Sequence, residues 1–118
     1  MNKEFALKFS REWVESWNSH DIDLILSHYT EDFEIESPLA KQRFPKSDGL
    51  IKGKEAVKEY WSWGLELNPD LEFEIIDVLC GVTTISIYYL SKSSKVNVVE
   101  MMTFNEDSKV IKATVNYS

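Results

Sequence analysis

A single carboxylate stands in an otherwise apolar row of side chains between positions 96 and 104. This segment alternates as a strand does, so one of its faces would carry Val96, Val98, Glu100, Met102 and Phe104. A carboxylate buried in such a row is costly as an anion and tends to keep its proton. Glu100 is therefore either a functional acid in a cavity or a structural acid. A structural acid would accept a hydrogen bond from Trp13 or water, or would point outward through a shifted register.

Few other residues offer chemistry of this kind. His28 lies beside the buried face of a predicted short helix, where it is either a proton shuttle near Glu100 or, as we favour, a solvated or capped side chain. His20 falls in a predicted turn, and no cysteine or aspartate stands at ligand spacing, so the sequence predicts no metal site. Neither a glycine-rich phosphate loop nor a nucleophile elbow occurs, and we expect no cofactor.

The composition limits the possible classes of protein. The 118 residues fit one domain, residues 1–118, and four tryptophans suggest a large apolar interior or a cavity. The net charge of −7, without a basic stripe, argues against nucleic acid. The absence of a signal peptide or a membrane-spanning stretch predicts a soluble, cytoplasmic protein. The lone Cys80 rules out an internal disulfide, and its apolar neighbours predict a buried thiol.

Helices are expected in the front half of the chain. An amphipathic helix over residues 3–18 follows from the four-residue spacing of Phe5, Phe9, Trp13 and Trp17. Asp21 then caps a short helix, and a strand over residues 33–37 ends at Pro38. Residues 38–53 read as a long loop because they are rich in proline and glycine. A further helix starts near Gly53 and should bury Ala56, Val57, Tyr60, Trp61, Gly64 and Leu65.

The back half alternates as strands over residues 71–80, 83–90, 96–104 and 109–117. The first of these strands changes parity near Ile75 and Ile76, which predicts a β-bulge. The inner face of the last strand is expected to carry Ile111, Ala113, Val115 and Tyr117. Helices followed by antiparallel strands predict an α+β domain, in which a curved antiparallel sheet wraps the long N-terminal helix and leaves a cone-shaped cavity. Glu100 would face this cavity, whose walls would be Trp13, Trp61, Met102, Phe104, Val115 and Tyr117.

The outward parity of the late strands is also apolar. Val99 and Met101 lie on one strand, with Ile85 and Ile87, or Tyr88, on its neighbour, depending on the register. A sheet that is apolar on both faces needs cover on both. We therefore expect a homodimer packed sheet to sheet, unless these residues form only a small patch.

Three stretches of the sequence resemble the NTF2-like superfamily. Residues 13–38 (WVESWNSHDIDLILSHYTEDFEIESP) are similar to its front, an aromatic helix, an Asp-initiated short helix and a strand ending in proline. Residues 51–57 (IKGKEAV) look like its usual helix start. Residues 100–111 (EMMTFNEDSKVI) resemble the closing hairpin of the SnoaL-like and ketosteroid-isomerase-like branches. The resemblance covers essentially the whole chain and implies the NTF2-like, or cystatin-like, fold and a sheet-to-sheet dimer.

The resemblance to ketosteroid isomerases implies a changed site. Their base falls at Ser37, which cannot abstract a proton unaided, and their oxyanion-hole tyrosine falls at Trp13. The acid of that hole falls at Glu100, a supporting tyrosine falls at Trp61, and the third member of the network is kept as Tyr29. Steroid isomerisation is therefore not expected. In SnoaL-like cyclases an Asp acts as acid/base, and Glu100 is its plausible counterpart.

Two classes of function follow. The first is a SnoaL-like isomerase, cyclase or dehydratase that acts on an apolar, carbonyl-bearing small molecule with Glu100 as acid/base. The second is a non-catalytic domain that binds a hydrophobic ligand, and a third, weaker option is a dimerisation module with a filled cavity. For either of the first two, the candidate ligand-binding residues are Trp13, Trp17, Tyr29, Ser37, Trp61, Met102, Phe104, Val115 and Tyr117.

Overall fold

The computed structural model describes all 118 residues, and it opens with the long helix that the aromatic spacing predicts. Helix α1 spans Lys3–Ser19 and buries Ala6, Phe9, Trp13 and Trp17. Asn2 caps its N-terminus by accepting a 2.7 Å hydrogen bond from the backbone N–H of Phe5. His20 ends the helix in the left-handed conformation, with φ of 61°. Helix α2, Ile22–Leu26, follows directly, and Asp21 caps it as expected.

Six strands form one curved sheet in the order β2-β1-β6-β5-β4-β3. Their bounds are β1 Tyr29–Glu36, β2 Leu50–Lys52, β3 Phe73–Cys80, β4 Thr84–Ser91, β5 Val96–Phe104 and β6 Val110–Tyr117. Four of the five neighbouring pairs are antiparallel, but β1 runs parallel to β6. The sheet is therefore mixed, and the expectation of a wholly antiparallel sheet is corrected at this one pair.

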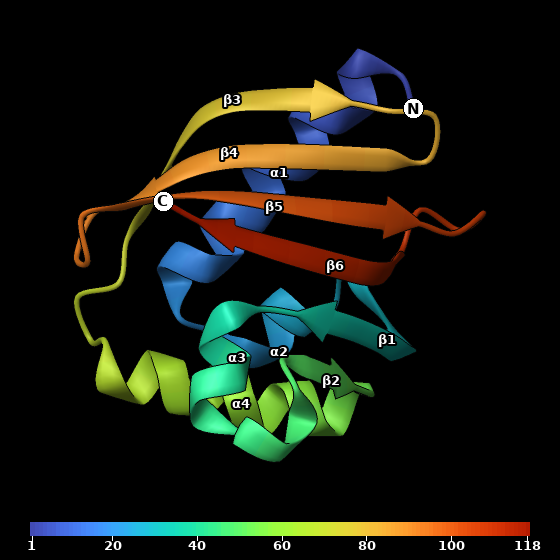
Figure 1. Cartoon of the computed structure of the whole chain (residues 1–118). Coiled ribbons are helices and arrows are strands. Elements are labelled where there is room, and N and C mark those ends of the chain that lie inside the picture. Colours follow the sequence, from blue (N-terminus) through green and yellow to red (C-terminus); the bar gives the residue numbers. More distant parts are fainter.

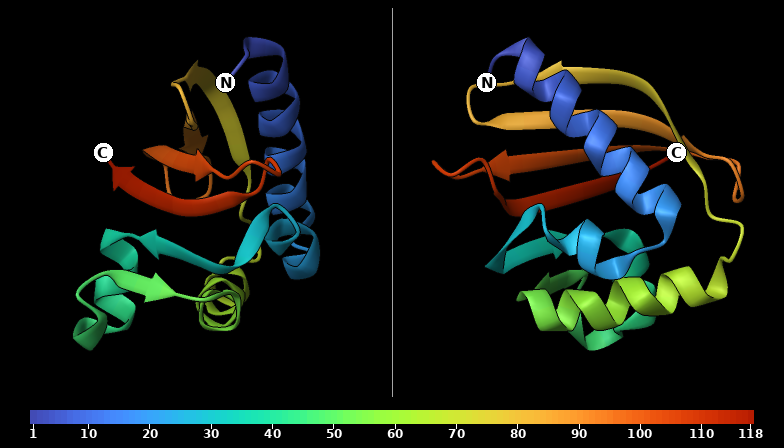
Figure 2. Two further views of the ribbon diagram at one scale, coloured as in Figure 1. Left: turned by 90° about the vertical axis from the view of Figure 1, so that its right-hand side faces the viewer. Right: turned by 180° about the vertical axis from the view of Figure 1, so that it is seen from behind.

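The helices cover one face of this sheet and its lower end. The right-hand view of Figure 2, seen from behind, shows α1 crossing diagonally in front of strands β3 to β6, with α4 running beneath it beside β1 and β2. The apolar stripe of α1 packs against the concave side of the sheet, so that the helix and the sheet bury each other's apolar side chains. The overall α+β architecture matches the predicted cone.

The predicted loop over residues 38–53 is wrong. This stretch holds helix α3, Pro38–Arg43, a 3-10 turn at Pro45–Ser47 and strand β2, before α4, Lys54–Leu67, begins (Figure 1). Ser37 caps α3 by accepting a 3.2 Å hydrogen bond from the backbone N–H of Leu39. The two prolines start the helical turns rather than break them, because proline is well tolerated in the first turn, where its missing N–H needs no partner.

Two bulges decide which side chains face inward. The bulge in β3 lies at Ile76, between the pairs Ile75–Tyr89 and Asp77–Tyr88, as the change of parity predicts. A second bulge lies in β6, where Phe104 pairs with Val110 and Thr103 with Lys112. Ile111 is the extra residue there and is 38% exposed, so its predicted inward position is wrong, and Val110 is buried in its place.

Two further burial predictions fail. Ala56 lies on the exposed side of α4, whereas Val57, Tyr60 and Trp61 are buried, because the helix rests on β1 by one narrow stripe. The thiol of Cys80 is exposed rather than buried, since β3 is the edge strand and Cys80 is its last residue.

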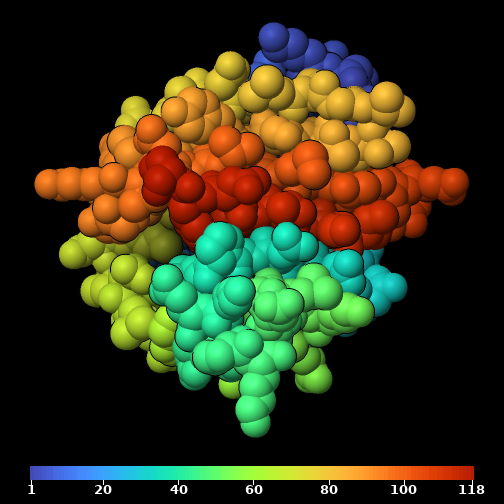
Figure 3. Space-filling view, in the orientation of Figure 1, coloured from blue at the N-terminus to red at the C-terminus, as the bar shows by residue number.

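The outer face of the sheet is partly apolar, but not through all the residues expected. Ile85 and Ile87 are fully buried on the inner face, so their outward assignment is wrong. Val99 and Met101 of β5 are 36% and 42% exposed, and Tyr88 of β4 pairs with Val99. Figure 3 shows strands β3 to β6 forming the whole upper front of the molecule, without a helix over them.

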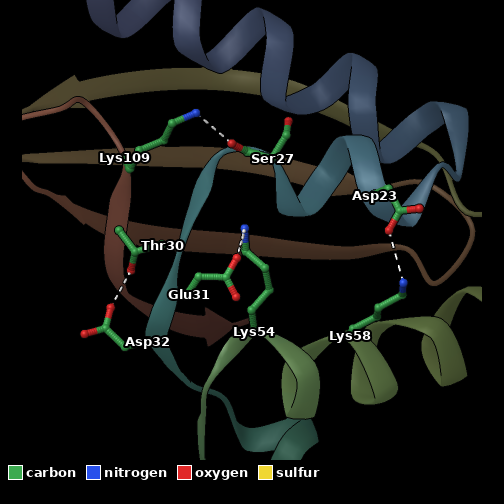
Figure 4. Close-up of polar contacts among 8 residues, drawn as sticks. All are labelled: Asp23, Ser27, Thr30, Glu31, Asp32, Lys54, Lys58 and Lys109. Carbon is green, nitrogen blue, oxygen red and sulfur yellow. Dashed lines mark hydrogen bonds and ion pairs between the residues drawn. The ribbon is translucent and has the colours of Figure 1, made fainter.

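Ion pairs on the surface join α4 to α2 and β1. Lys58 of α4 contacts Asp23 of α2 at 3.1 Å, and Lys54 contacts Glu31 of β1 at 3.6 Å (Figure 4). These pairs are exposed, and exposed pairs stabilise a fold only weakly. Both pairs nonetheless involve α4, the helix whose Tyr60 and Trp61 are buried in the interior. No helix in the structure is both long and apolar enough to cross a membrane.

Candidate functional site

A cavity of about 100 Å³ lies between the end of α1, the inner side of α4 and the concave face of the sheet. Most of its wall is apolar, and its polar atoms come mainly from hydroxyl groups and one carboxyl group. The lining residues are Trp17, Ile35, Ser37, Leu39, Tyr60, Trp61, Trp63, Gly64, Asn68, Leu71, Phe73, Tyr89, Glu100, Val115 and Tyr117. A mostly apolar pocket with few polar groups is the usual form of a small-molecule site.

Glu100 supplies the carboxyl group of this cavity. It projects inward from β5, and the whole residue is only 4% exposed. Its Oε1 atom accepts a 3.1 Å hydrogen bond from the hydroxyl of Tyr89, whereas its Oε2 atom is buried and has no partner. Burial raises the pKa of Glu100 to about 7, and the hydrogen bond from Tyr89 opposes that shift. A carboxyl with this pKa can both release and take up a proton near neutral pH.

Trp13, one of the donors that the structural alternative names, does not hydrogen-bond to this carboxyl. Its indole N–H donates instead to the hydroxyl of Tyr29, at 3.0 Å in the buried core. The Tyr29 hydroxyl in turn contacts the sulfur of Met102 at 3.9 Å. The indole N–H of Trp13 and the hydroxyl of Tyr29 therefore have their partners within the core, and Trp13, Tyr29 and Met102 do not line the cavity.

Three tyrosines bring neutral hydroxyl groups to the cavity wall. Burial raises the pKa of Tyr89 and Tyr60 well above the ordinary tyrosine value, and the charge of Glu100 raises both further. Burial also raises the pKa of Tyr117, and hydrogen bonding with Ser37 opposes the shift at Tyr60 and Tyr117. These tyrosines stay protonated at neutral pH. The Tyr89 hydroxyl donates its hydrogen to Glu100, so Tyr60 and Tyr117 are the ones that can donate hydrogen bonds to a ligand oxygen.

A second unpartnered polar atom belongs to the same cavity. The indole Nε1 of Trp17 is buried and makes no hydrogen bond. Trp17 packs edge to face on Trp61, with ring centroids 5.0 Å apart, so its ring orientation is fixed by neighbours. Buried donors and acceptors usually have partners, so Oε2 of Glu100 and Nε1 of Trp17 are two unsatisfied polar atoms on residues that line one cavity.

The structure separates the predicted ligand-binding residues into two groups. Trp17, Ser37, Trp61, Val115 and Tyr117 line the cavity together with Glu100. Trp13, Tyr29, Met102 and Phe104 do not line it, because they are buried in the core. The ring of Phe104, for example, packs edge to face on Phe9, 4.8 Å between centroids.

Sequence reasoning missed Tyr60, Tyr89, Phe73 and Asn68 as lining residues. Tyr89 had a usable signal, because it shares the parity of Ile85 and Ile87, which both face inward. Tyr60 was expected only as a buried residue of its helix. Phe73 and Asn68 depend on how the α4–β3 connection folds back over the cavity, which no local pattern shows.

Neither histidine reaches Glu100. The ring of His28 packs edge to face on Phe9, and its Nδ1 lies 3.2 Å from the backbone oxygen of Ile25. Burial lowers the pKa of His28, so the ring is neutral at pH 7, and the side chain serves the packing of α1 on α2. His20 instead contacts the backbone oxygen of Leu71 at 2.8 Å and ties the end of α1 to the cavity's mouth. The structure shows no cluster of three or more His, Cys, Asp or Glu residues that could hold a metal ion.

Comparison with known proteins identifies the family. The sequence profile of the SnoaL-like domain matches residues 10–112. A SnoaL-like protein of unknown function from Burkholderia thailandensis E264 is 41% identical over 99% of this chain and 97% of its own, with a TM-score of 0.95. No curated protein sequence matches the chain.

Two more distant structures share the fold. The epoxide hydrolase/cyclase-like enzyme SalBIII, which has a role in pyran ring formation in the polyether salinomycin, is 18% identical over 99% of this chain and 93% of its own, with a TM-score of 0.76. TerC, co-crystallised with polyporic acid, is 12% identical over 96% of this chain and 91% of its own, with a TM-score of 0.74. On the family match and the 41% identity, the chain belongs to the SnoaL-like branch of the NTF2-like superfamily.

Proposed function

We propose that this protein is an acid/base enzyme that acts on an apolar, carbonyl-bearing small molecule, with Glu100 as the group that moves the proton. The observation that carries the proposal is the free Oε2 atom of Glu100, buried in the wall of the cavity with its pKa near 7. Structural acids usually have both oxygens hydrogen-bonded. An unpartnered buried oxygen on a residue that lines a cavity supports a catalytic acid instead.

The proposed step is a proton transfer next to the carbonyl. The ionised Glu100 takes a proton from the carbon beside the carbonyl, so that a C–H bond breaks and an O–H bond forms at Oε2. The electron pair of the C–H bond moves into an enolate, whose oxygen accepts hydrogen bonds from donors in the wall, the hydroxyls of Tyr60 and Tyr117 or the Trp17 N–H. Return of the same proton to a conjugated carbon completes an isomerisation and regenerates the carboxylate.

The distant relatives support the general class of ligand. SalBIII is an epoxide hydrolase/cyclase-like enzyme with a role in pyran ring formation, and TerC was crystallised with polyporic acid. The molecules in both cases are oxygenated organic compounds, which fits a cavity with apolar walls and hydroxyl donors. The reaction type is our proposal and rests on Glu100.

A non-catalytic binding domain is the second candidate, and the position of Ser37 favours it. Its hydroxyl accepts a hydrogen bond from the N–H of Leu39, and Glu100 is the one carboxylate side chain in the cavity. A site with one acid can bind a ketone without turning it over. The two candidates differ in whether a bound ketone exchanges its protons.

Proton exchange in heavy water tests the proposal without knowledge of the product. Small aryl and cyclic ketones would be incubated with the protein in D₂O, and loss of the signal from the hydrogens beside the carbonyl would be followed by NMR. We expect exchange that rises with pH through about 7 and is lost in Glu100→Gln. Glu106→Gln, in the exposed β5–β6 turn, is the matched control and should exchange normally. Binding without exchange would overturn the enzyme proposal and favour the binding domain.

A further inference from the structure

A larger outer chamber of about 520 Å³ adjoins the cavity. The two spaces share part of their walls, at Leu39, Asn68, Leu71, Phe73, Tyr89 and Tyr117. The outer chamber lies where α3, the β4–β5 turn and the end of β6 come together, on the side marked C in Figure 1. For comparison, an engineered apolar cavity of about 150 Å³ in another protein holds one benzene molecule. The inner cavity therefore has room for roughly one small ring or a short chain, and a larger ligand must extend into the outer chamber.

Half of the residues that line the outer chamber are apolar, and its polar side chains carry no charge. The polar residues that line the outer chamber but not the inner cavity are Gln42, Ser91, Ser93, Ser94 and Ser118. Asn68 lines both. Ser94 donates to Ser91 at 2.8 Å, and the Asn68 amide donates to the backbone of Gly64 at 2.8 Å, which leaves its side-chain oxygen free. The side chains of Gln42 and Ser93 make no hydrogen bond within the chain. The chamber thus offers both donors and acceptors to a ligand.

Apart from Glu100, no charged side chain lines either chamber, although 28% of the residues in the chain are charged. No lysine, arginine, histidine or aspartate side chain lines either space, and Glu100 is the one carboxylate side chain. A bound carboxylate or phosphate would lose water without gaining a cation, and Glu100 would repel it. This selects against anions.

We infer that the ligand is an uncharged molecule in two parts, with an apolar, carbonyl-bearing end in the inner cavity and a hydroxylated part in the outer chamber. This inference rests on the proposed function, because the carbonyl end is the part that meets Glu100. At that end, the Nε1–H of Trp17 is free to donate to the carbonyl oxygen of the ligand, and the Oε2 of Glu100 is free to take the proton from the neighbouring carbon. The serine and amide side chains of the outer chamber bind the hydroxyl groups.

Three ketones with one common core test this inference. 4-Ethoxyacetophenone carries the apolar end alone, 4-acetylphenyl β-glucoside adds a neutral polyol, and 4-acetylphenoxyacetate adds an anion. Quenching of tryptophan fluorescence reports binding, because three tryptophans line the inner cavity. We expect the glucoside to bind roughly fivefold more tightly than the ethoxy compound, as two or so net hydrogen bonds would give, and the anion to bind most weakly.

Two variants locate the effect in the outer chamber. Gln42→Ala with Ser93→Ala should remove the advantage of the glucoside over the ethoxy ketone, because both side chains belong to the outer chamber alone. Ser93→Lys should improve binding of the anion, whereas Ser62→Lys, which adds the same charge on α4 outside both chambers, should not.

The outcomes separate this inference from the proposed function. Equal binding of all three ketones, or an advantage of the glucoside that survives the double variant, overturns the two-part ligand but leaves the acid/base role of Glu100 standing. Failure of all three ketones to bind overturns both. Tight binding of the anion to the unaltered protein overturns the requirement for an uncharged ligand.

Discussion

The hydroxyl of Tyr89 on β4 donates a hydrogen bond to the carboxyl of Glu100 on the neighbouring strand β5, at 3.1 Å. The bond occupies one carboxyl oxygen and leaves the other, which is also buried, without a partner. It therefore fixes the orientation of the acid without closing it off. Because burial holds the pKa of Tyr89 well above its ordinary value, the phenol stays a donor over the whole neutral range.

Glu100→Gln should change how stability depends on pH. The folded state raises the pKa of Glu100 from 4.5 to about 7, so the unfolded chain binds fewer protons than the folded one between these values. The stability linked to the protonated acid is fully present below pH 4.5 and is lost as the pH rises through 7, by roughly 3 kcal/mol. Urea unfolding at both ends of this range should therefore show that the free energy of unfolding of Glu100→Gln, relative to that of the unaltered protein, increases by about that amount toward high pH. A difference that stays constant with pH would contradict the raised pKa.

Tyr89→Phe should raise the pKa of Glu100 further. Loss of the donor removes the contact that favours the ionised carboxyl. The pH profile of proton exchange should shift upward, and unfolding should cost about 1–3 kcal/mol less because Oε1 is left without a partner. Tyr88→Phe is the matched control, since Tyr88 points to the outer face and accepts only from Asn97 at 3.3 Å. An unshifted profile in Tyr89→Phe would contradict the role of this bond.

Tyr29→Phe should weaken the fold and spare the site. The substitution leaves the buried indole N–H of Trp13 without its acceptor, which should lower the free energy of unfolding by about 1–3 kcal/mol. Neither residue lines the cavity, so ketone binding measured by fluorescence at a temperature where the variant is folded should be unchanged. Loss of binding by the folded variant would instead place Tyr29 in the site.

We propose that the outer face of the sheet forms a homodimer through Val99, Met101 and Tyr88. Sedimentation at tens of micromolar should then show a dimer, and Met101→Glu should convert it to a monomer by burying a charge at the interface. Val82→Glu is the control, because Val82 is 89% exposed but lies in the β3–β4 turn. A monomer at that concentration, or a dimer insensitive to Met101→Glu, would contradict this arrangement.

The position of Glu100 could be predicted because β5 alternates strictly over nine residues. The walls around it could not. Strand parity tells which face a side chain takes, but not how much of that face a helix covers, and α1 covers Phe104 through Phe9 while leaving Glu100 open to the cavity. The faces of β4 were ambiguous for a related reason, since Tyr88 and Ile87 are both apolar, and only the pairing of Ile87 with Glu100 decides between them.

Residues 38–53 were predicted as a loop because their helical turns are too short to show a period. A signal was present at their start, where Ser37 followed by Pro38 is a common beginning of a helix. The parallel pairing of β1 with β6 left no local trace, because it joins segments about 80 positions apart.

That parallel pair also sets the order in which the protein can fold on the ribosome. Figure 1 shows β6 joining the upper strands to the lower unit of α2, β1, β2, α3 and α4. Strand β1 emerges early, but its partner on that side, residues 110–117, emerges late, and such long-range contacts form slowly. The emerging chain must carry β1 with one edge open throughout most of its synthesis, exposed to chaperones and to neighbouring chains. Both chambers of the site, which include Tyr117, take shape only when β6 docks.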